Sequence, residues 1–308
     1  MNDTLAIETT GLQKTFNATV AVSELNLAIR RGELYGLVGP DGAGKTTTMR
    51  LLTGIMTPTA GEARVAGYSV LTDAERIKER IGYMSQRFGL YEDLTVMENI
   101  LFYADIYEVP RREREPRIER LLGFSNLTPF GDRLAGKLSG GMKQKLGLAC
   151  ALIHTPEILF LDEPTNGVDP VSRRDFWRIL YDLLREGVTI FLSTSYLDEA
   201  ERCGRIGLMH KGKVIIEDQP QNVRASLALP MLEVWTDDVR TAGERVRTVR
   251  GVSTVSMYGD RLHIGLAGKD DAAAVLGALE QAGIPVRDHR DILPSLEDVF
   301  IAMVEKPA

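Results

Sequence analysis

The stretch Gly39–Thr47, GPDGAGKTT, decides how the surrounding chain folds. Its glycines, lysine and threonine have the spacing G-x-x-x-x-G-K-[ST] of a phosphate-binding loop. The apolar run 34–38 predicts a buried strand before the loop, and 48–52 predicts a helix after it. Glycine lets backbone N–H groups turn toward an anion, and the helix points its positive dipole end at the same place. Lys45 adds a charge for the β- and γ-phosphates and Thr46 a hydroxyl for Mg²⁺, so the stretch predicts a nucleotide site.

The composition is that of a soluble globular protein, with 308 residues, 44% of them hydrophobic and 26% charged. This length allows one large domain or two ordinary ones. The net charge of −6 provides no basic surface for nucleic acid. Cys150 and Cys203 form neither a disulfide framework nor a metal-ligand spacing, which suits a reducing cytoplasm. We expect no signal peptide and no apolar run near the ~18 residues of a membrane span, so another chain would have to cross the membrane.

Two adjacent carboxylates follow a second buried strand. The continuous apolar run 158–161 is typical of a strand in a parallel sheet, and Asp162 and Glu163 come directly after it. The carboxyl ends of such strands are where α/β sheets place their chemistry. Asp162 can enter a Mg²⁺ shell and Glu163 can polarise a water, although a plain strand-ending turn also fits the pair taken alone. Asp169 is a further loop carboxylate before the next helix.

Three further positions flank predicted strands and helices. Ser139–Gly141 precedes a helix, where a small hydroxyl and bare backbone N–H groups form a second possible anion site or a plain helix-start loop. Gln86 follows the predicted strand 81–84 and is, by itself, an ordinary loop amide. Phe16 lies in a polar neighbourhood, which alone favours a half-buried aromatic at a sheet edge.

The chain beyond a composition shift at 220–230 predicts a small second unit. Its expected elements are strands 231–236, 252–258, 261–266 and 284–287, helices 239–249 and 271–282, and a closing helix 295–304. The order β-α-β-β-α-β is the ferredoxin-like pattern. His263 and His289 occur singly, which favours structural roles over ligand roles. We expect dimer stabilisation from this unit rather than ligand sensing.

Taken together, the spaced motifs resemble an ABC-transporter ATP-binding cassette over about residues 5–225. They are GPDGAGKTT, Gln86, LSGGMKQK at 138–145, ILFLDEPTNGVDP at 158–170 and STSYLDEA at 193–200. The set is most similar to the multidrug-export, ABC-2-type branch, whose C-terminal extension the tail PSLEDVF at 294–300 resembles. The resemblance implies an α/β fold: a P-loop NTPase core with an antiparallel β subdomain and an α-helical subdomain at about 88–150. The expected domains are therefore a cassette over 1–226 and a ferredoxin-like accessory domain over 227–308.

The resemblance also implies roles for individual residues. Phe16 would stack on the adenine, and Ser139, Gly140 and Gly141 would contact the γ-phosphate of ATP bound to the opposite subunit. The other implied nucleotide-binding residues are Gly39, Pro40, Asp41, Gly42, Ala43, Gly44, Lys45, Thr46, Thr47, Gln86, Asp162 and Asp169. The implied metal-binding residues are Thr46, Gln86 and Asp162. The implied catalytic residues are Glu163, Lys45, Gln86 and Ser195.

The function implied by the resemblance is that of an ATP-hydrolysing motor for an efflux transporter. Two cassettes, either a homodimer or a pair of related subunits, would sandwich ATP head to tail. A separate membrane-spanning permease would dock a coupling helix at about Phe88–Glu92. The chain would therefore lie in the cytoplasm, peripheral on the inner membrane, and would not bind nucleic acid.

Two positions depart from the family pattern. Ser195 stands where the family has a histidine, whose imidazole donates to the γ-phosphate and helps to orient the attacking water. A serine hydroxyl does not reach as far, and none of the four histidines, His154, His210, His263 and His289, is placed in the sequence to replace it. Asp41 stands where asparagine is common and adds negative charge beside the phosphates. These departures predict ATP binding with weakened hydrolysis, either in a slow homodimer or in the weaker site of an asymmetric pair.

Three alternative functions share parts of this pattern. A soluble ABC ATPase of translation or DNA repair usually has two cassettes or a long coiled-coil insertion, and this chain has neither. A P-loop kinase leaves LSGG unexplained. An ATP-gated regulatory cassette that hydrolyses weakly or not at all is favoured by Ser195 alone, and ATPase measurement with and without the membrane partner separates it from a transport motor.

Overall fold

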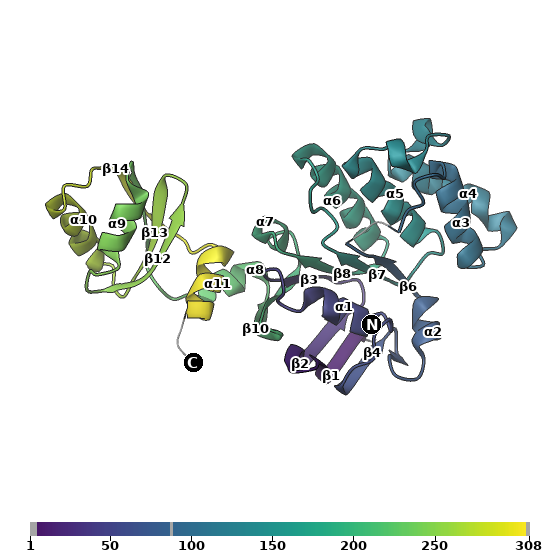
Figure 1. Ribbon diagram of the computed structural model, residues 1–308, viewed down its shortest axis with the longest axis horizontal. Coiled ribbons are helices and arrows are strands. Elements are labelled where there is room, and N and C mark those ends of the chain that lie inside the picture. The colour runs from purple at the N-terminus through teal and green to yellow at the C-terminus, as the bar shows by residue number, and fades with distance from the viewer. Residues whose placement is uncertain (1–4, 87–88, 306–308) are drawn as a thin grey trace. The chain divides into compact units, whose positions relative to one another are not determined.

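The computed structural model describes residues 5–86 and 89–305, and the chain divides into two compact units between Glu217 and Asp218 (Figure 1). This division falls earlier than the expected boundary at 226/227. The difference arises from α8 (Pro220–Ser226), a helix where the sequence suggested only a change of composition. Proline at the first helical position favours this start, and α8 packs against α11 (Leu296–Glu305) of the same unit. None of the helices in the described ranges is long and apolar enough to cross a membrane.

The first unit begins with an antiparallel sheet of four strands in the order β2-β1-β4-β5. Its strands are β1 (Leu5–Phe16), β2 (Thr19–Arg30), β4 (Ala60–Val65) and β5 (Tyr68–Ser69). Burial alternates in β2, where Leu25, Leu27 and Ile29 are buried and the residues between them are exposed. This sheet therefore presents one apolar face to the core.

The second sheet of this unit has six strands in the order β10-β9-β3-β8-β7-β6. They are β3 (Leu34–Val38), β6 (Ile81–Met84), β7 (Ile158–Asp162), β8 (Thr189–Thr194), β9 (Arg205–His210) and β10 (Lys213–Asp218). The pairs β3–β8, β8–β7 and β7–β6 are parallel. Strands β3, β7 and β8 are buried throughout, as the continuous apolar runs predict for β3 and β7. Their carboxyl ends therefore lie at one edge of the sheet.

Helix α1 (Lys45–Leu52) directly follows the phosphate loop and contacts strands of both sheets (Figure 1). The remaining helices are α2 (Ala74–Lys78), α3 (Val96–Ile106), α4 (Arg111–Phe124), α5 (Gly140–Leu152), α6 (Pro170–Arg185) and α7 (Leu197–Ala200), with short 3₁₀ turns at Thr128–Phe130 and Ala135–Lys137. Helices α3, α4 and α5 pack on one another as a helical subdomain. A capping box begins α3: Glu98 N–H donates to Thr95 Oγ1 at 3.1 Å, and Thr95 N–H donates to the Glu98 carboxylate at 2.8 Å.

The second unit has the predicted order β-α-β-β-α-β, with the sheet order β12-β13-β11-β14. Its elements are β11 (Met231–Thr236), α9 (Val239–Val246), β12 (Val252–Tyr258), β13 (Arg261–Leu266), α10 (Asp271–Gln281) and β14 (Val286–Ile292), followed by α11. Strand β14 is longer than predicted. Its exposed, charged residues lack alternation, yet they pair with β11 as far as Ile292 opposite Met231.

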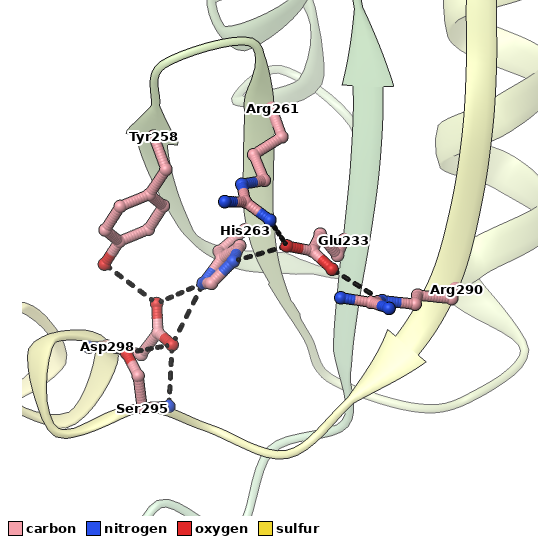
Figure 2. A network of polar contacts seen from close by, with 7 residues as sticks. All are labelled: Glu233, Tyr258, Arg261, His263, Arg290, Ser295 and Asp298. Atoms are coloured by element: carbon pink, nitrogen blue, oxygen red, sulfur yellow. Dashed lines mark hydrogen bonds and ion pairs between the residues drawn. The ribbon is translucent and has the colours of Figure 1, made fainter.

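A network of charged side chains joins the second unit's sheet to the start of α11 (Figure 2). Glu233 in β11 is 3% exposed and pairs with Arg261 at 3.0 Å, His263 at 3.2 Å and Arg290 at 2.7 Å. The other nitrogen of the His263 ring lies 3.2 Å from both oxygens of Asp298 in α11. His263 therefore has the structural role that we expected, as a cross-link between two carboxylates.

Candidate nucleotide site

The phosphate loop is shaped by close backbone contacts at two of its glycines. A Cβ on Gly39 would lie 2.2 Å from the carbonyl oxygen of Met209. Gly44 has a φ of +112°, and a Cβ there would lie 2.3 Å from the carbonyl oxygen of Ala21. Only glycine fits these two positions without moving the backbone. The lysine of the loop, Lys45, is 4% exposed and donates to the carbonyls of Gly39 at 2.7 Å and Pro40 at 3.0 Å.

A cavity of about 310 Å³ opens in front of this loop and the first turn of α1. It is lined by Ala21, Asp41, Gly42, Gly44, Lys45, Thr46, Thr47, Gln86 and Glu163. The structure thus brings the loop, the glutamine after β6 and the glutamate after β7 to one place, although more than a hundred positions separate Lys45 from Glu163 in the sequence. Backbone N–H groups, the helix dipole and an ammonium group make this cavity suited to a chain of phosphates.

Asp162 ends β7 and is 1% exposed. Its Oδ1 accepts hydrogen bonds from Thr46 Oγ1 at 3.1 Å and from Ser193 Oγ at 2.6 Å. Its Oδ2 is buried and has no hydrogen-bond partner among the described residues. A buried carboxylate oxygen without a partner is costly, so this position fits a cation such as Mg²⁺, which prefers oxygen ligands.

Glu163 follows Asp162 and has the left-handed φ of 49°, which is uncommon for a residue with a side chain. Its backbone N–H donates to the carbonyl and to the hydroxyl of Ser193, each at 3.1 Å. Among the described residues, three donors surround its carboxylate. Lys45 Nζ lies 3.0 Å from Oε1, while Gln86 Nε2 and Asn166 Nδ2 donate to Oε2 at 3.1 Å and 3.4 Å. The predicted catalytic residues Lys45, Gln86 and Glu163 are therefore in direct contact.

The second predicted anion site lies at the start of α5 and is absent from the lining of the cavity at Lys45. Ser139 caps the helix, and its Oγ accepts from the N–H of Met142 at 3.3 Å. A Cβ on Gly140 would meet no described atom within 4 Å, whereas one on Gly141 would lie 2.4 Å from Ser172 in α6. Gly141 is thus required by packing within the chain, and Gly140 faces open space.

The remaining predicted residues lie at the edges of the site. Phe16 ends β1, is 44% exposed and has Lys14 Nζ 5.2 Å from its ring centroid. Asp169 caps α6 and accepts from the N–H groups of Val171 at 3.0 Å and Ser172 at 2.9 Å. Hydrogen bonding by Ser172, together with that from Val171, lowers the pKa of the Asp169 carboxyl. Neither Phe16 nor Asp169 lines the cavity at Lys45.

The loop after β8 contains functional candidates that the sequence analysis missed. Ser195 itself is exposed, and its side chain makes no hydrogen bond to the part of the chain that the structure describes. Two residues near it make side-chain hydrogen bonds within the site. Ser193 Oγ donates to Asp162 Oδ1, and Tyr196 Oη donates to Asn166 Oδ1 at 3.1 Å. The only sequence signal for these residues was their position at the end of a buried strand next to the family's histidine position.

A separate groove of about 830 Å³ is lined by residues between the end of α1 and α4, together with His154. Ile55 and Ile106 line it and are 57% and 56% exposed. Tyr107 also lines it and stacks on His154 at 3.8 Å between centroids, and burial lowers the pKa of His154 to about 4. Of the segment expected to receive a coupling helix, Phe88 lies outside the described residues. Gly89 and Leu90 line a smaller cavity that shares Tyr107 with this groove.

Two family models match the sequence. The model described as ABC transporter matches residues 22–166. The model described as ATP-binding protein DrrA1-3-like, C-terminal domain, matches residues 219–304. The two matches fall on the first and the second compact unit, respectively.

Individual proteins with known names or structures are similar to the chain. The probable multidrug ABC transporter ATP-binding protein YbhF of Escherichia coli (strain K12) is 50% identical over 230 residues, which are 74% of this chain and 40% of YbhF. The chain thus spans well under half of the length of YbhF. The daunorubicin/doxorubicin resistance ATP-binding protein DrrA of Streptomyces peucetius is 36% identical over 311 residues, covering 99% of this chain and 94% of DrrA. The solved dimeric structure of the cassette MJ0796 in a post-hydrolysis state, bound to ADP and Pi, is 27% identical, with a TM-score of 0.63, and covers 69% of this chain and 98% of that one.

Proposed function

The chain belongs to the ATP-binding subunits of ABC transporters, in the branch with a DrrA-like C-terminal domain, and we propose that it hydrolyses ATP to drive export through a separate membrane-spanning subunit. The observation that carries this proposal is the cavity in which Lys45, Gln86 and Glu163 meet at the phosphate loop. Relatives named for multidrug transport and for daunorubicin resistance support an efflux role.

In the proposed reaction, the oxygen of a water molecule attacks the γ-phosphorus of ATP, and the bond from that phosphorus to the bridging oxygen of ADP breaks. Glu163 accepts the proton of the water and later releases it to solvent. Lys45 leaves the Glu163 carboxylate to bind the β- and γ-phosphates, because the phosphates carry more negative charge than one carboxylate. The backbone N–H groups from Gly42 to Thr47 cradle the phosphates.

Thr46, Asp162 and Gln86 are proposed to hold Mg²⁺ beside the phosphates. The partnerless Oδ2 of Asp162 and the adjacent Thr46 hydroxyl support this assignment. Bound there, Mg²⁺ would supply charge neutralisation for the β- and γ-phosphate oxygens. Ser193 holds the other oxygen of Asp162 and so orients the carboxylate.

We also propose a head-to-tail pair of cassettes, either two copies of this chain or this chain with a related one. Ser139 and Gly140 stand at an open helix start that is absent from the lining of the cavity at Lys45. In such a pair, they contact the γ-phosphate of ATP bound to the partner cassette. The dimeric state of the similar cassette MJ0796 supports this arrangement.

The membrane partner is proposed to insert a short helix into the groove that contains Ile55, Ile106 and Tyr107. This groove shares Tyr107 with the cavity lined by Gly89 and Leu90, which belong to the segment where docking was expected. Exposed apolar side chains in a concave groove are suited to an amphipathic helix. This docking would place the cassette on the cytoplasmic face of the inner membrane. Tyr83 of β6, the strand that leads to Gln86, also lines the groove. The docked helix of the membrane partner would therefore contact the strand before the glutamine that is proposed to bind Mg²⁺.

A second candidate function is an ATP-gated regulatory cassette with little or no hydrolysis, which the exposed Ser195 favours. One experiment separates the two. The chain is purified from membranes with whatever spanning subunit accompanies it, and MgATP turnover is measured with and without that subunit. We expect turnover that Lys45→Ala abolishes. ATP binding without turnover in both preparations would support the regulatory cassette instead.

A further inference from the structure

Among the described residues, Glu163 has three side-chain donors, and we expect one of them to remain when nucleotide binds as proposed above. Lys45, at 3.0 Å from Oε1, is drawn to the phosphates, and Gln86, at 3.1 Å from Oε2, is drawn to the metal. Asn166, whose amide lies 3.4 Å from Oε2, does not line the cavity at Lys45. The orientation of the carboxylate at the moment of reaction then depends on Asn166.

The amide of Asn166 is itself held by a tyrosine. Tyr196 Oη donates to Asn166 Oδ1 at 3.1 Å. An ionised carboxylate only accepts hydrogen bonds, so the NH₂ group of Asn166 must face Glu163 and its oxygen must face the phenol. The hydrogen bonds from Tyr196 to Asn166 and from Asn166 to Glu163 therefore run in one consistent direction.

Tyr196 is fixed on two sides. Its backbone N–H donates to Thr194 Oγ1 at 3.0 Å, at the end of β8. The guanidinium of Arg173 in α6 lies 4.7 Å from the centroid of its ring, and Arg173 also lies 3.5 Å from Asp198. Because Ser193 of the same strand receives the backbone N–H of Glu163, β8 and the loop after it hold both the main chain and the side chain of Glu163.

We propose that Tyr196 is a positioning residue for ATP hydrolysis: through Asn166 it orients the Glu163 carboxylate toward the attacking water. This inference rests on the proposed function. The loop in which Ser195 stands at the family's histidine position would thus still influence hydrolysis, through Tyr196. A histidine there would act on the γ-phosphate directly, whereas Tyr196 acts on the base that receives the proton. The chain can thus keep the Glu163 carboxylate oriented without an imidazole at position 195.

The test compares MgATP turnover of the full chain, with its membrane subunit present, for the wild type, Tyr196→Phe, Asn166→Ala and the double variant. Phenylalanine keeps the ring over Arg173 and removes only the hydroxyl. Tyr181→Phe is the matched control, because its hydroxyl also makes one hydrogen bond, to the carbonyl of Arg202 at 3.4 Å, away from the site. We expect Tyr196→Phe to lower kcat by about tenfold with KM for ATP unchanged, since misoriented catalytic groups cost rate rather than binding.

The double variant should be no slower than Asn166→Ala, because both changes break the same chain of hydrogen bonds. A kcat for Tyr196→Phe equal to that of Tyr181→Phe overturns the inference, as do additive losses in the double variant or a loss that lies only in KM. The proposed function fails in a different way. A wild-type chain that binds ATP but shows no turnover with its membrane subunit overturns the proposed function, and the inference falls with it.

Discussion

Lys45 Nζ and Glu163 Oε1 lie 3.0 Å apart, and the two side chains are 4% and 7% exposed. The ion pair joins the residue expected to bind phosphate to the residue expected to activate water. The three N–H donors of Lys45 are already used by the carbonyls of Gly39 and Pro40 and by Glu163. We therefore expect a phosphate chain that binds Lys45 to displace one of these partners, and we propose that Glu163 is the one released.

Glu163→Gln should trap an ATP-bound dimer. The amide keeps the shape of the side chain but accepts no proton, so we expect turnover to fall by about a hundredfold or more. ATP should bind at least as tightly, since the neutral amide no longer competes for Lys45. Size-exclusion chromatography with ATP measures the dimer, and Glu115→Gln on the exposed face of α4 is the control. A Glu163→Gln chain that remains monomeric with ATP would contradict the expectation.

Ser195→His should raise the ATPase rate. An imidazole at this exposed position reaches the γ-phosphate as an added donor, and one well-placed donor is worth about a hundredfold in rate. We expect a smaller gain, about tenfold, because an exposed side chain is not held in one orientation and only a well-placed donor has the full effect. Ser195→Ala serves as the control and should stay near the wild-type rate. Equal or lower turnover in Ser195→His would show that the loop cannot use the imidazole.

The sequence predicted the parts of the fold that depend on local patterns. The buried runs of β3 and β7 and the phosphate loop are all present at their expected positions. The sequence did not predict α8 or the length of β14. The charged residues of β14 show no apolar alternation, and the strand is held instead by backbone pairing with β11.

The contacts inside the site were predictable only in part. The motif spacing predicted that Lys45 and Glu163 would share a site, because parallel strands meet at their carboxyl ends. It did not predict their direct ion pair, nor the bond from Tyr196 to Asn166, because these depend on side-chain packing between segments far apart in the chain. Such contacts leave no periodic signal in the sequence.

Gly140 and Gly141 should respond differently to alanine. A Cβ on Gly141 lies 2.4 Å from the Cβ of Ser172, so Gly141→Ala should lower the free energy of unfolding by about 1–3 kcal/mol. The Cβ of Gly140→Ala meets no described atom within 4 Å, and this change should leave stability equal or slightly higher, because alanine favours a helix over glycine. It should also weaken ATP-driven dimerisation. Urea unfolding and size-exclusion chromatography measure the two effects. Adding Ser172→Gly should restore the stability of Gly141→Ala, and unchanged dimerisation in Gly140→Ala would argue against the proposed pairing.

The His263 cross-link should make the stability of the second unit depend on pH. Burial lowers the pKa of His263, but the hydrogen bond and charge of Asp298, followed by those of Glu233, outweigh it and raise the pKa above its ordinary value. For Asp298, burial raises the pKa of the carboxyl group. The hydrogen bonds to His263 and Ser295 outweigh burial, so the net pKa is below its ordinary value. The protonated imidazole therefore stabilises the fold fully below about pH 6.5, and this contribution is lost as the pH rises through the raised value. The carboxylate contribution is lost only as the pH falls below about 4.

His263→Gln tests this dependence. Loss of a hydrogen-bonded charge between Asp298 and Glu233 should cost about 1–3 kcal/mol at pH 6, and the difference from wild type should shrink as the pH rises above the His263 pKa. Hydrogen exchange of the α11 amides, compared between variant and wild type at each pH, measures the local stability, because intrinsic exchange rates then cancel. His289→Gln, on the exposed edge strand β14, is the control and should match wild type throughout. A His263→Gln difference that is the same at pH 6 and pH 9 would mean that the ring acts by packing and not by charge.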